Sequence, residues 1–165
     1  MKDVHTLNIQ IDAAKCTACK ACELACSFTK EGAFAPASSR IRVLQLHHAG
    51  MNVPTVCMNC VDAPCVDGCF TGAMHRDEET GMVLYDANMC VGCWTCIMVC
   101  PFGAIRCRVE GSKTASKCDL CQGKPVCVTH CIYGALSFGP GAEVSCPEAD
   151  SAPDRGNPDS PGDVP

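Results

Sequence analysis

Cysteine is the residue type in this sequence whose number and spacing could do chemistry. Eighteen of the 165 residues are cysteine, and sixteen of these form four groups of four, which leaves Cys107 and Cys146 outside. Each group opens with two cysteines separated by two residues and closes with two separated by three. The groups are Cys16, Cys19, Cys22 and Cys26; Cys57, Cys60, Cys65 and Cys69; Cys90, Cys93, Cys96 and Cys100; and Cys118, Cys121, Cys127 and Cys131.

The third group, which Pro101 follows, matches the bacterial ferredoxin pattern C-x2-C-x2-C-x3-C-P, and the first differs from it only at Ser27. Cysteines three residues apart on a tight loop can bind three corners of a 4Fe-4S cubane. The fourth cysteine lies where the chain turns away into a helix, so it ligates the neighbouring cluster. The four groups therefore predict four 4Fe-4S clusters in cross-linked pairs, with all sixteen cysteines as iron ligands.

Other uses of dense cysteine fit less well. A structural zinc site takes two C-x2-C pairs and leaves no place for a third cysteine inside the loop. Disulfides between such close neighbours would be strained. One or two groups holding a 3Fe-4S cluster, or no cluster, stays open as an alternative.

The N-terminal residues favour the metal interpretation over a secreted disulfide framework. Residues 1–10 contain neither an apolar signal-peptide core nor twin arginines, and no apolar run approaches the ~18 residues of a membrane span. We therefore expect a cytoplasmic protein without a direct membrane span. A subunit without its own signal can still be exported while bound to a partner that has one.

Charge is concentrated at the C-terminus. Residues 140–165 carry the whole formal net charge of −5, and they are rich in Pro and Gly. This composition predicts a disordered acidic tail. Docking of the tail onto a partner or a second copy of the chain is a further hypothesis. Residues 1–139 are formally neutral and hold no basic patch, so nucleic-acid binding has no electrostatic support.

A repeated pattern predicts an α+β fold of short elements. Gly-Ala and an aliphatic residue follow the closing cysteine of three groups, around Gly72, Gly103 and Gly134. This pattern predicts a short helical turn bearing the cysteine, a glycine stop and an apolar strand. Asp12 and Asp86 predict turns that lead from a strand into the first and third groups. Residues 73–76 and 82–85 predict a β-hairpin.

Two insertions interrupt the predicted domain, which spans residues 1–139. Residues 30–56 contain a predicted strand at 40–46 that pairs with 53–56, and residues 106–117 form a second insertion that turns at Gly111. Insertions in a repeat often lie on a binding face. The alternative is that they shield clusters from water, and the sequence favours neither.

The order and spacing of the four groups, over residues 9–138, resemble the four-cluster ferredoxin-like electron-transfer subunits of molybdenum and tungsten oxidoreductases, formate dehydrogenases, hydrogenases and carbon monoxide dehydrogenase. The resemblance implies a tandem fold of two interleaved modules with two 4Fe-4S clusters each. It also implies that the first group pairs with the fourth and the second with the third. The four implied ligand sets are Cys16, Cys19, Cys22 and Cys131; Cys118, Cys121, Cys127 and Cys26; Cys57, Cys60, Cys65 and Cys100; and Cys90, Cys93, Cys96 and Cys69.

A finer resemblance lies in residues 22–27 and 38–43, which are similar to the iron–sulfur subunits of tungsten-dependent aldehyde oxidoreductases and their benzoyl-CoA reductase relatives. The carbon monoxide dehydrogenase partner subunit is the main competitor. The implied partner is a large catalytic subunit with a tungsten or molybdenum pterin. A flavin- or NAD-linked subunit, or further copies of the chain, are additional candidates.

Nothing else in the sequence is arranged for bond chemistry, so we expect a non-catalytic electron-transfer subunit. The five histidines are scattered, and no nucleophile elbow or phosphate loop is present. His130 and Trp94 are interpreted as surface or packing residues beside clusters. A freely diffusing polyferredoxin and an iron–sulfur regulatory or assembly protein remain alternatives.

Overall fold

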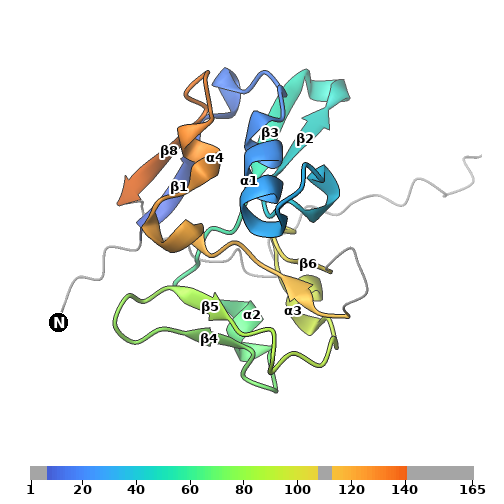
Figure 1. Cartoon of the computed structure of the whole chain (residues 1–165), viewed down its shortest axis with the longest axis vertical. Coiled ribbons are helices and arrows are strands. Elements are labelled where there is room, and N and C mark those ends of the chain that lie inside the picture. Colours follow the sequence, from blue (N-terminus) through green and yellow to red (C-terminus); the bar gives the residue numbers. More distant parts are fainter. Residues whose placement is uncertain (1–6, 108–112, 141–165) are drawn as a thin grey trace, which may run out of the picture.

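The computed structural model describes residues 7–107 and 113–140 (Figure 1). Within them the chain forms short helices and four separate two-stranded antiparallel sheets, which confirms the α+β class. The predicted turn at Gly111, the thiol of Cys146 and the acidic tail beyond Pro140 lie outside the described residues. No helix in the described part of the chain is long and apolar enough to cross a membrane.

Each sheet pairs two short strands. Strand β1 (Leu7–Ile11) pairs with β8 (Leu136–Pro140), and β2 (Arg42–Leu46) pairs with β3 (Met51–Thr55). Strand β4 (Met74–Arg76) pairs with β5 (Val83–Tyr85), and β6 (Arg106–Cys107) pairs with β7 (Ala115–Ser116). The β1–β8 pair joins the two ends of the described chain.

The helices are short apart from α1 (Ala21–Glu31). Helices α2 (Pro64–Asp67), α3 (Thr95–Met98) and α4 (Val126–Thr129) are single turns. The 3₁₀ turns are η1 (Ala13–Lys15), η2 (Pro36–Ser38), η3 (His47–Ala49) and η4 (Leu120–Gly123). One turn of helix is too short to be stable by itself, so tertiary contacts must hold these elements.

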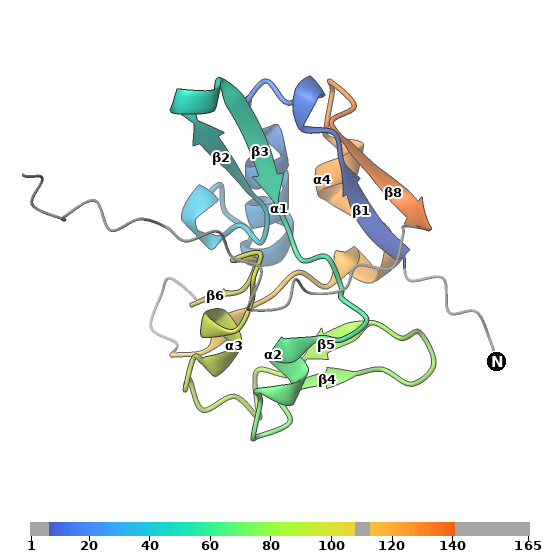
Figure 2. The same cartoon turned by 180° about the vertical axis from the view of Figure 1, so that it is seen from behind.

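The elements gather into two lobes (Figures 1 and 2). The upper lobe, residues 7–56 and 117–140, contains β1, β8, β2, β3, α1 and α4, with α1 packed on α4. The lower lobe, residues 57–107 and 113–116, contains β4–β7, α2 and α3, with α2 packed on α3. The first and fourth cysteine groups therefore lie in one lobe, and the second and third in the other.

The core consists of small aliphatic side chains interleaved with cysteines. Ile9 and Ile41 are almost fully buried in a cluster that also contains the thiols of Cys22, Cys118 and Cys127. A second cluster surrounds Met74 and Cys96 in the lower lobe. No Phe, Tyr or Trp among the described residues belongs to the fully buried set. Burial of cysteines thus does much of what aromatic packing does in other domains.

Several sequence predictions are confirmed, and one needs correction. The hairpin of β4 and β5 forms, and Asp12 and Asp86 accept hydrogen bonds from backbone N–H groups two residues further on, as an Asp-led turn requires. The single-turn helices, however, bear the third cysteine of their groups and not the closing one. Each closing cysteine lies in the turn that follows, because the helix has already ended.

The first insertion forms the predicted strand pair with a shorter loop. Its two strands are joined by four residues, 47–50, because Gly50 adopts a left-handed conformation that closes the turn early. Strand β8 runs through Gly139 and ends at Pro140, one residue into the segment whose composition suggested a tail. Pairing with Asn8 and Leu7 holds those two residues in the sheet.

Removal of iron and sulfide should unfold most of the chain. Two-stranded sheets and single-turn helices are marginal alone, and a core rich in cysteine loses its ligand-mediated cross-links without metal. We expect far-UV circular dichroism to show loss of most ordered structure after anaerobic chelation, with the untreated protein as control. An unchanged spectrum at full cluster loss would contradict this.

Candidate iron–sulfur sites

The structure brings cysteines that are distant in sequence into four sets. Set A contains Cys16, Cys19, Cys22 and Cys131, and all four line one cavity in the upper lobe. The first three lie on the loop and helix after β1, and the last lies in the turn between α4 and β8. Burial raises the pKa of Cys22 to about 11, and the charges of Cys19 and Cys131 add to the rise.

Set C contains Cys57, Cys60, Cys65 and Cys100, which line a cavity in the lower lobe. Cys65 lies on α2, and Cys100 lies just beyond α3. Burial raises the pKa of Cys65 to about 11, and the nearby thiols of Cys57 and Cys100 raise it further.

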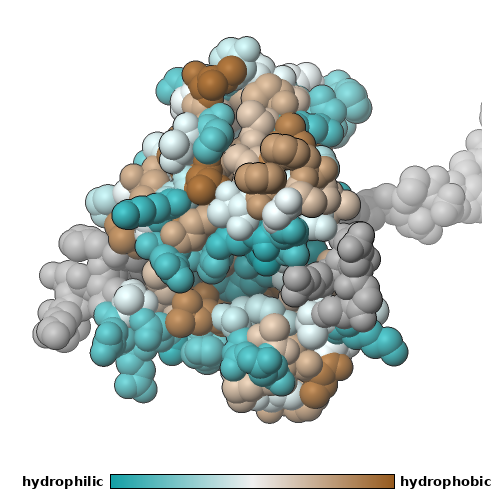
Figure 3. Space-filling model, in the orientation of Figure 1, coloured by the Kyte–Doolittle hydropathy of each residue, from teal (hydrophilic) through white to brown (hydrophobic). Residues whose placement is uncertain are grey.

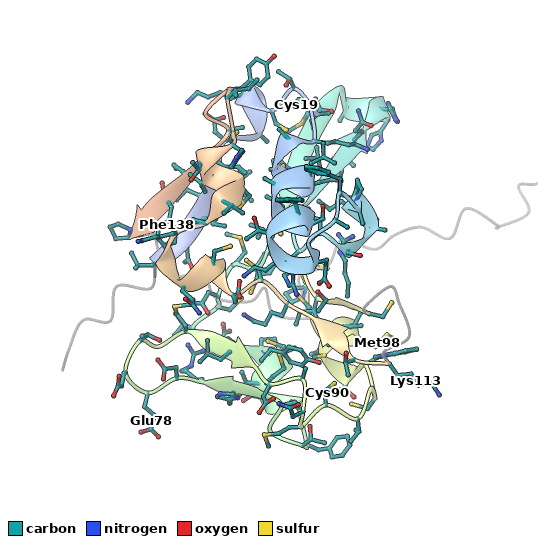
Figure 4. The ribbon with its side chains drawn as sticks, viewed as in Figure 1. Cys19, Glu78, Cys90, Met98, Lys113 and Phe138 are labelled. Carbon is teal, nitrogen blue, oxygen red and sulfur yellow. The ribbon has the colours of Figure 1, made fainter. Side chains whose placement is uncertain are left out.

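Set D contains Cys69, Cys90, Cys93 and Cys96, which line a third cavity. Burial raises the pKa of Cys96, and Cys69 and Cys90 contribute to the rise. The pKa of Cys69 is lowered: burial acts against this, but hydrogen bonds, first from the Met74 backbone, outweigh it. Figure 4 places Cys90 in the lower lobe and Cys19 at the far end of the upper lobe.

Set B contains Cys26, Cys118, Cys121 and Cys127, which lie in the upper lobe where α1 faces α4. Burial raises the pKa of Cys127 to about 12, and Cys26 and Cys121 reinforce this rise. Burial also raises the pKa of Cys118 strongly, and Cys57 of set C adds to it. Cys26, Cys118 and Cys127 belong to the same buried cluster.

In sets A to D the raised pKa values have one physical meaning. Several thiols held together in an apolar interior resist becoming thiolates, because each new charge is desolvated and repelled by the others. Bound cationic iron reverses this balance, so metal binding would release protons from these thiols. Among residues 7–107 and 113–140, no three His, Cys, Asp or Glu side chains converge closely enough to ligate a single metal ion.

The loops between paired cysteines share an unusual backbone conformation. The residue before the second cysteine of every group has a positive φ: 56° at Ala18, 51° at Asn59, 72° at Gly92 and 53° at Leu120. Lys20, Trp94 and Gln122 repeat this after the second cysteine. Left-handed non-glycine residues cost about 1 kcal/mol or more, so the cluster-binding loops store strain. Such turns point successive N–H groups to one side and form concave sites for anions.

Backbone and hydroxyl donors reach several cysteine sulfurs. The N–H groups of Arg40, Met74 and Leu120 donate to the Sγ atoms of Cys26, Cys69 and Cys118 at 3.4, 3.3 and 3.4 Å. The Thr95 hydroxyl donates to Cys93 Sγ at 3.6 Å. Hydrogen bonds to sulfur stabilise negative charge and raise the reduction potential of an iron–sulfur cluster.

Asn59 provides a test of whether the sites suit a 4Fe-4S cluster. Its side chain is 3% exposed, and its Oδ1 accepts a 2.7 Å hydrogen bond from the Val83 N–H. Its Nδ2 is buried without a hydrogen-bond partner and belongs to a residue that lines the set C cavity. A buried unpaired donor is costly unless an acceptor is supplied. Cluster sulfur is such an acceptor, and four thiols provide one ligand for each of four irons, so the residues fit the cluster.

Both insertions cover outer sets. Val43 and Pro54 of the first insertion line the set A cavity, and the Asn52 side chain donates to the Cys16 carbonyl at 2.9 Å. Ala115 of the second insertion lines the set D cavity. These contacts favour shielding of clusters from water over a purely partner-facing role. His130 also lines the set A cavity and Trp94 the set D cavity, and both side chains are partly exposed.

Sequence reasoning missed Asn59, Lys117 and the left-handed loops. Asn inside a C-x2-C pair was a usable signal, because Asn tolerates positive φ better than most residues. Ala18, Lys20 and Leu120 give no such signal. Cys107, which lies outside the four cysteine groups, is exposed in β6.

The chain belongs to the 4Fe-4S dicluster domain family, whose model matches residues 49–140, more than half of the sequence. It therefore binds 4Fe-4S clusters. The family match thus defines a domain that carries iron–sulfur clusters.

Among curated relatives, the polyferredoxin-like subunit of the aliphatic sulfonate oxidoreductase of Pyrococcus furiosus is 44% identical over 93 residues, which cover 56% of this chain and 53% of that protein. The electron transport protein HydN of Escherichia coli is 35% identical, with 57% and 55% covered. The iron–sulfur subunit ArrB of a Shewanella arsenate respiratory reductase is also 35% identical, with 60% and 44% covered. The chain thus spans about half the length of the curated relatives it matches.

Among solved structures, the BamBC active-site complex of benzoyl coenzyme A reductase with zinc contains a chain that is 29% identical. The match covers 87% of this chain and 83% of that one, at a TM-score of 0.49.

Gly92→Ala should disrupt set D. Gly92 has φ +72°, and a Cβ there would lie 2.0 Å from the Lys113 carbonyl oxygen, so the loop cannot keep its shape. Overpacking and backbone strain together should cost more than about 2 kcal/mol. We expect iron per chain to fall by about one cluster, measured by metal analysis. Gly103→Ala is the matched control, because its φ is +57° and a Cβ there meets nothing within 4 Å; equal losses in both variants would contradict a steric cause.

Asn59→Asp should lower the potential of one cluster. The substitution keeps an oxygen for the Val83 N–H but replaces the unpaired donor with a negatively charged oxygen. The cluster would lose a hydrogen-bond donor and gain a negatively charged neighbour. We therefore expect its reduction to become less favourable by roughly 1 kcal/mol. Redox titration followed by electron paramagnetic resonance should detect it in one cluster only. Asn88→Asp, which adds the same charge at an exposed position, should leave all potentials near their original values.

Proposed function

We propose that this chain relays single electrons through four 4Fe-4S clusters between a catalytic oxidoreductase subunit and a second redox partner. Sets A to D would each hold one cluster, and all sixteen cysteines would be ligands. When bound, the clusters supply reversible one-electron reduction. The chain itself positions them, excludes water and supplies hydrogen bonds to sulfur.

One observation carries this proposal. Cysteines from different groups lie together in sets of four, with Cys131 beside Cys16 and Cys100 beside Cys57. Each set takes three cysteines from one group and the closing cysteine of another. This cross-pairing is the arrangement expected of two-cluster ferredoxins, and it supports two interleaved modules, one for each lobe.

The sets follow one another along the molecule in the order A, B, C, D. Sets A and B share α1, which carries Cys22 and Cys26. Cys118 of set B interacts with Cys57 of set C across the boundary between the lobes. Sets C and D share α2 and the turn after it, where Cys65 and Cys69 lie.

Sets A to D thus form a row, and its two end sets, A and D, are the ones open to solvent. Of the sixteen grouped cysteines, only Cys19 of set A and Cys93 of set D are exposed. On the face drawn in Figure 3, hydrophilic side chains form a band across the middle, and hydrophobic ones are exposed on both lobes. Ile132, next to Cys131 of set A, and Met98, which lies with Cys96 of set D on α3, are more than three-quarters exposed. Exposed apolar surface beside a terminal site suits contact with redox partners.

The proposed partner is a large catalytic subunit with a tungsten or molybdenum pterin. The similarity of residues 22–27 and 38–43 to the iron–sulfur subunits of tungsten-dependent aldehyde oxidoreductases supports tungsten. The naming of a 44% identical relative as a subunit of an aliphatic sulfonate oxidoreductase supports a complex with a catalytic partner.

We place the four-cluster domain at residues 1–139 and assign the acidic tail to partner docking. We favour the cytoplasm as its location, because dense thiols need a reducing compartment.

Iron and acid-labile sulfide per chain test the cofactor content after anaerobic purification. We expect about sixteen of each, since four cubanes contain four irons and four sulfides apiece. About twelve would mean one empty set, and set B, with its five-residue middle spacer, would be the first to examine. Zinc without sulfide would overturn the electron-transfer proposal.

Copurification tests the subunit role. A tagged chain isolated from its native source should bring a larger subunit that contains tungsten or molybdenum, identified by mass spectrometry and metal analysis. A fully loaded chain that is isolated alone and is reduced reversibly would instead indicate a freely diffusing polyferredoxin.

A further inference from the structure

Lys117 is a buried lysine at the boundary between the two lobes. Its side chain is 6% exposed, and it directly precedes Cys118. Its Nζ donates to the Val83 carbonyl on β5 at 2.6 Å and to the Cys118 carbonyl at 2.9 Å. One side chain thus connects the lower-lobe hairpin with the loop that carries set B.

The ammonium group has no carboxylate partner among the described residues. The ion pairs in this part of the chain are Lys15–Asp12, Lys30–Asp119 and Arg40–Glu31, and none includes Lys117. Two carbonyl oxygens satisfy hydrogen bonds but do not neutralise a charge. A buried charge without a counter-charge is expensive, so the environment of Lys117 should contain negative charge from another source.

The two hydrogen bonds of Lys117 place its amine beside both inner sets. Cys118, whose carbonyl accepts one of them, belongs to set B, and Val83, whose carbonyl accepts the other, lines the set C cavity. Cys118 and Cys57 of set C also belong to one buried cluster. Thiolates bound to iron in these two sets would supply the missing negative charge. Lys117 therefore lies where the two halves of the row meet, with its charge acting on both.

We propose that Lys117 is a positioning residue whose fixed positive charge sets the reduction potentials of the two inner clusters and so eases electron passage between the lobes. The inference rests on the proposed function, because it needs clusters in sets B and C. An added electron makes a cluster more negative, and a nearby buried cation stabilises that state more than it would in water. The same cation weakens the repulsion between two adjacent reduced clusters.

A purely structural role is the competing explanation. The hydrogen bonds to Val83 and Cys118 could serve only to hold the lobes together, in which case the charge would not matter. Lys117→Met removes the charge and both hydrogen bonds but keeps an unbranched side chain, whereas Lys117→Arg keeps the charge. Lys124, which is exposed and lies between Cys121 and Cys127, provides a matched control, because solvent and salt should screen its charge.

The measurement is a potentiometric titration of the anaerobic full chain, followed by electron paramagnetic resonance, with iron and sulfide determined for every variant. In Lys117→Met we expect the one-electron reduction constants of two clusters to fall at least tenfold, which is about 59 mV each. The reduction constants of the other two clusters should change less than threefold. In Lys117→Arg and in Lys124→Met, the reduction constants of all four clusters should stay within threefold of those of the unaltered chain.

Each outcome has a defined meaning. If Lys117→Met retains only about eight irons while Lys117→Arg retains about sixteen, the structural role is favoured and the inference is overturned, since arginine keeps hydrogen-bond donors as well as the charge. Four unchanged potentials in Lys117→Met would overturn the inference, as would an arginine variant as damaged as the methionine one or loss of all clusters in both. If the unaltered chain lacks iron and sulfide, the proposed function itself fails, which the metal analysis distinguishes.

Discussion

Repulsion among buried thiolates is the constraint on which the rest of this structure depends. Sixteen cysteines are gathered into four sets, and burial together with mutual charge raises the pKa of Cys22, Cys65, Cys118 and Cys127. Such sets are unfavourable as bare thiolates and stable only around cationic iron. The fold is correspondingly slight: two-stranded sheets and single helical turns are sufficient because the metal centres cross-link the segments that hydrophobic packing alone would not hold.

The remaining polar features can be understood as responses to negative charge around the sets. Backbone N–H groups point at Cys26, Cys69 and Cys118, the Asn59 amide borders set C, and Lys117 lies at the boundary between sets B and C. The strained left-handed residues belong to the same response, since they turn N–H groups toward one side of each loop. Strain of this kind is tolerated where bound cofactors determine the backbone more strongly than local preference does.

The sequence was informative where chemistry depends on spacing. The four cysteine groups, the β4–β5 hairpin, the Asp12 and Asp86 turns and the strand pair after Arg42 were all predictable, because each depends on local residue types. The positive φ values at Ala18, Lys20 and Leu120 were not, since tertiary contacts override the preferences of these residues. Lys117 was equally hidden: a lysine before a cysteine is ordinarily an exposed residue, and only the packing of β5 against its loop buries it.

The out-and-back path of the chain between the lobes has a consequence for biogenesis. All eight cysteines of sets C and D lie between Cys57 and Cys100, so the lower lobe has its complete ligand complement once that stretch has left the ribosome. Set A must wait for Cys131, and β1 must wait for β8, although Cys16 and β1 precede the lower-lobe stretch in the chain. The lower lobe is therefore ready for cluster insertion first, while Cys16, Cys19 and Cys22 stay open to solvent and oxidants until Cys131 has been made.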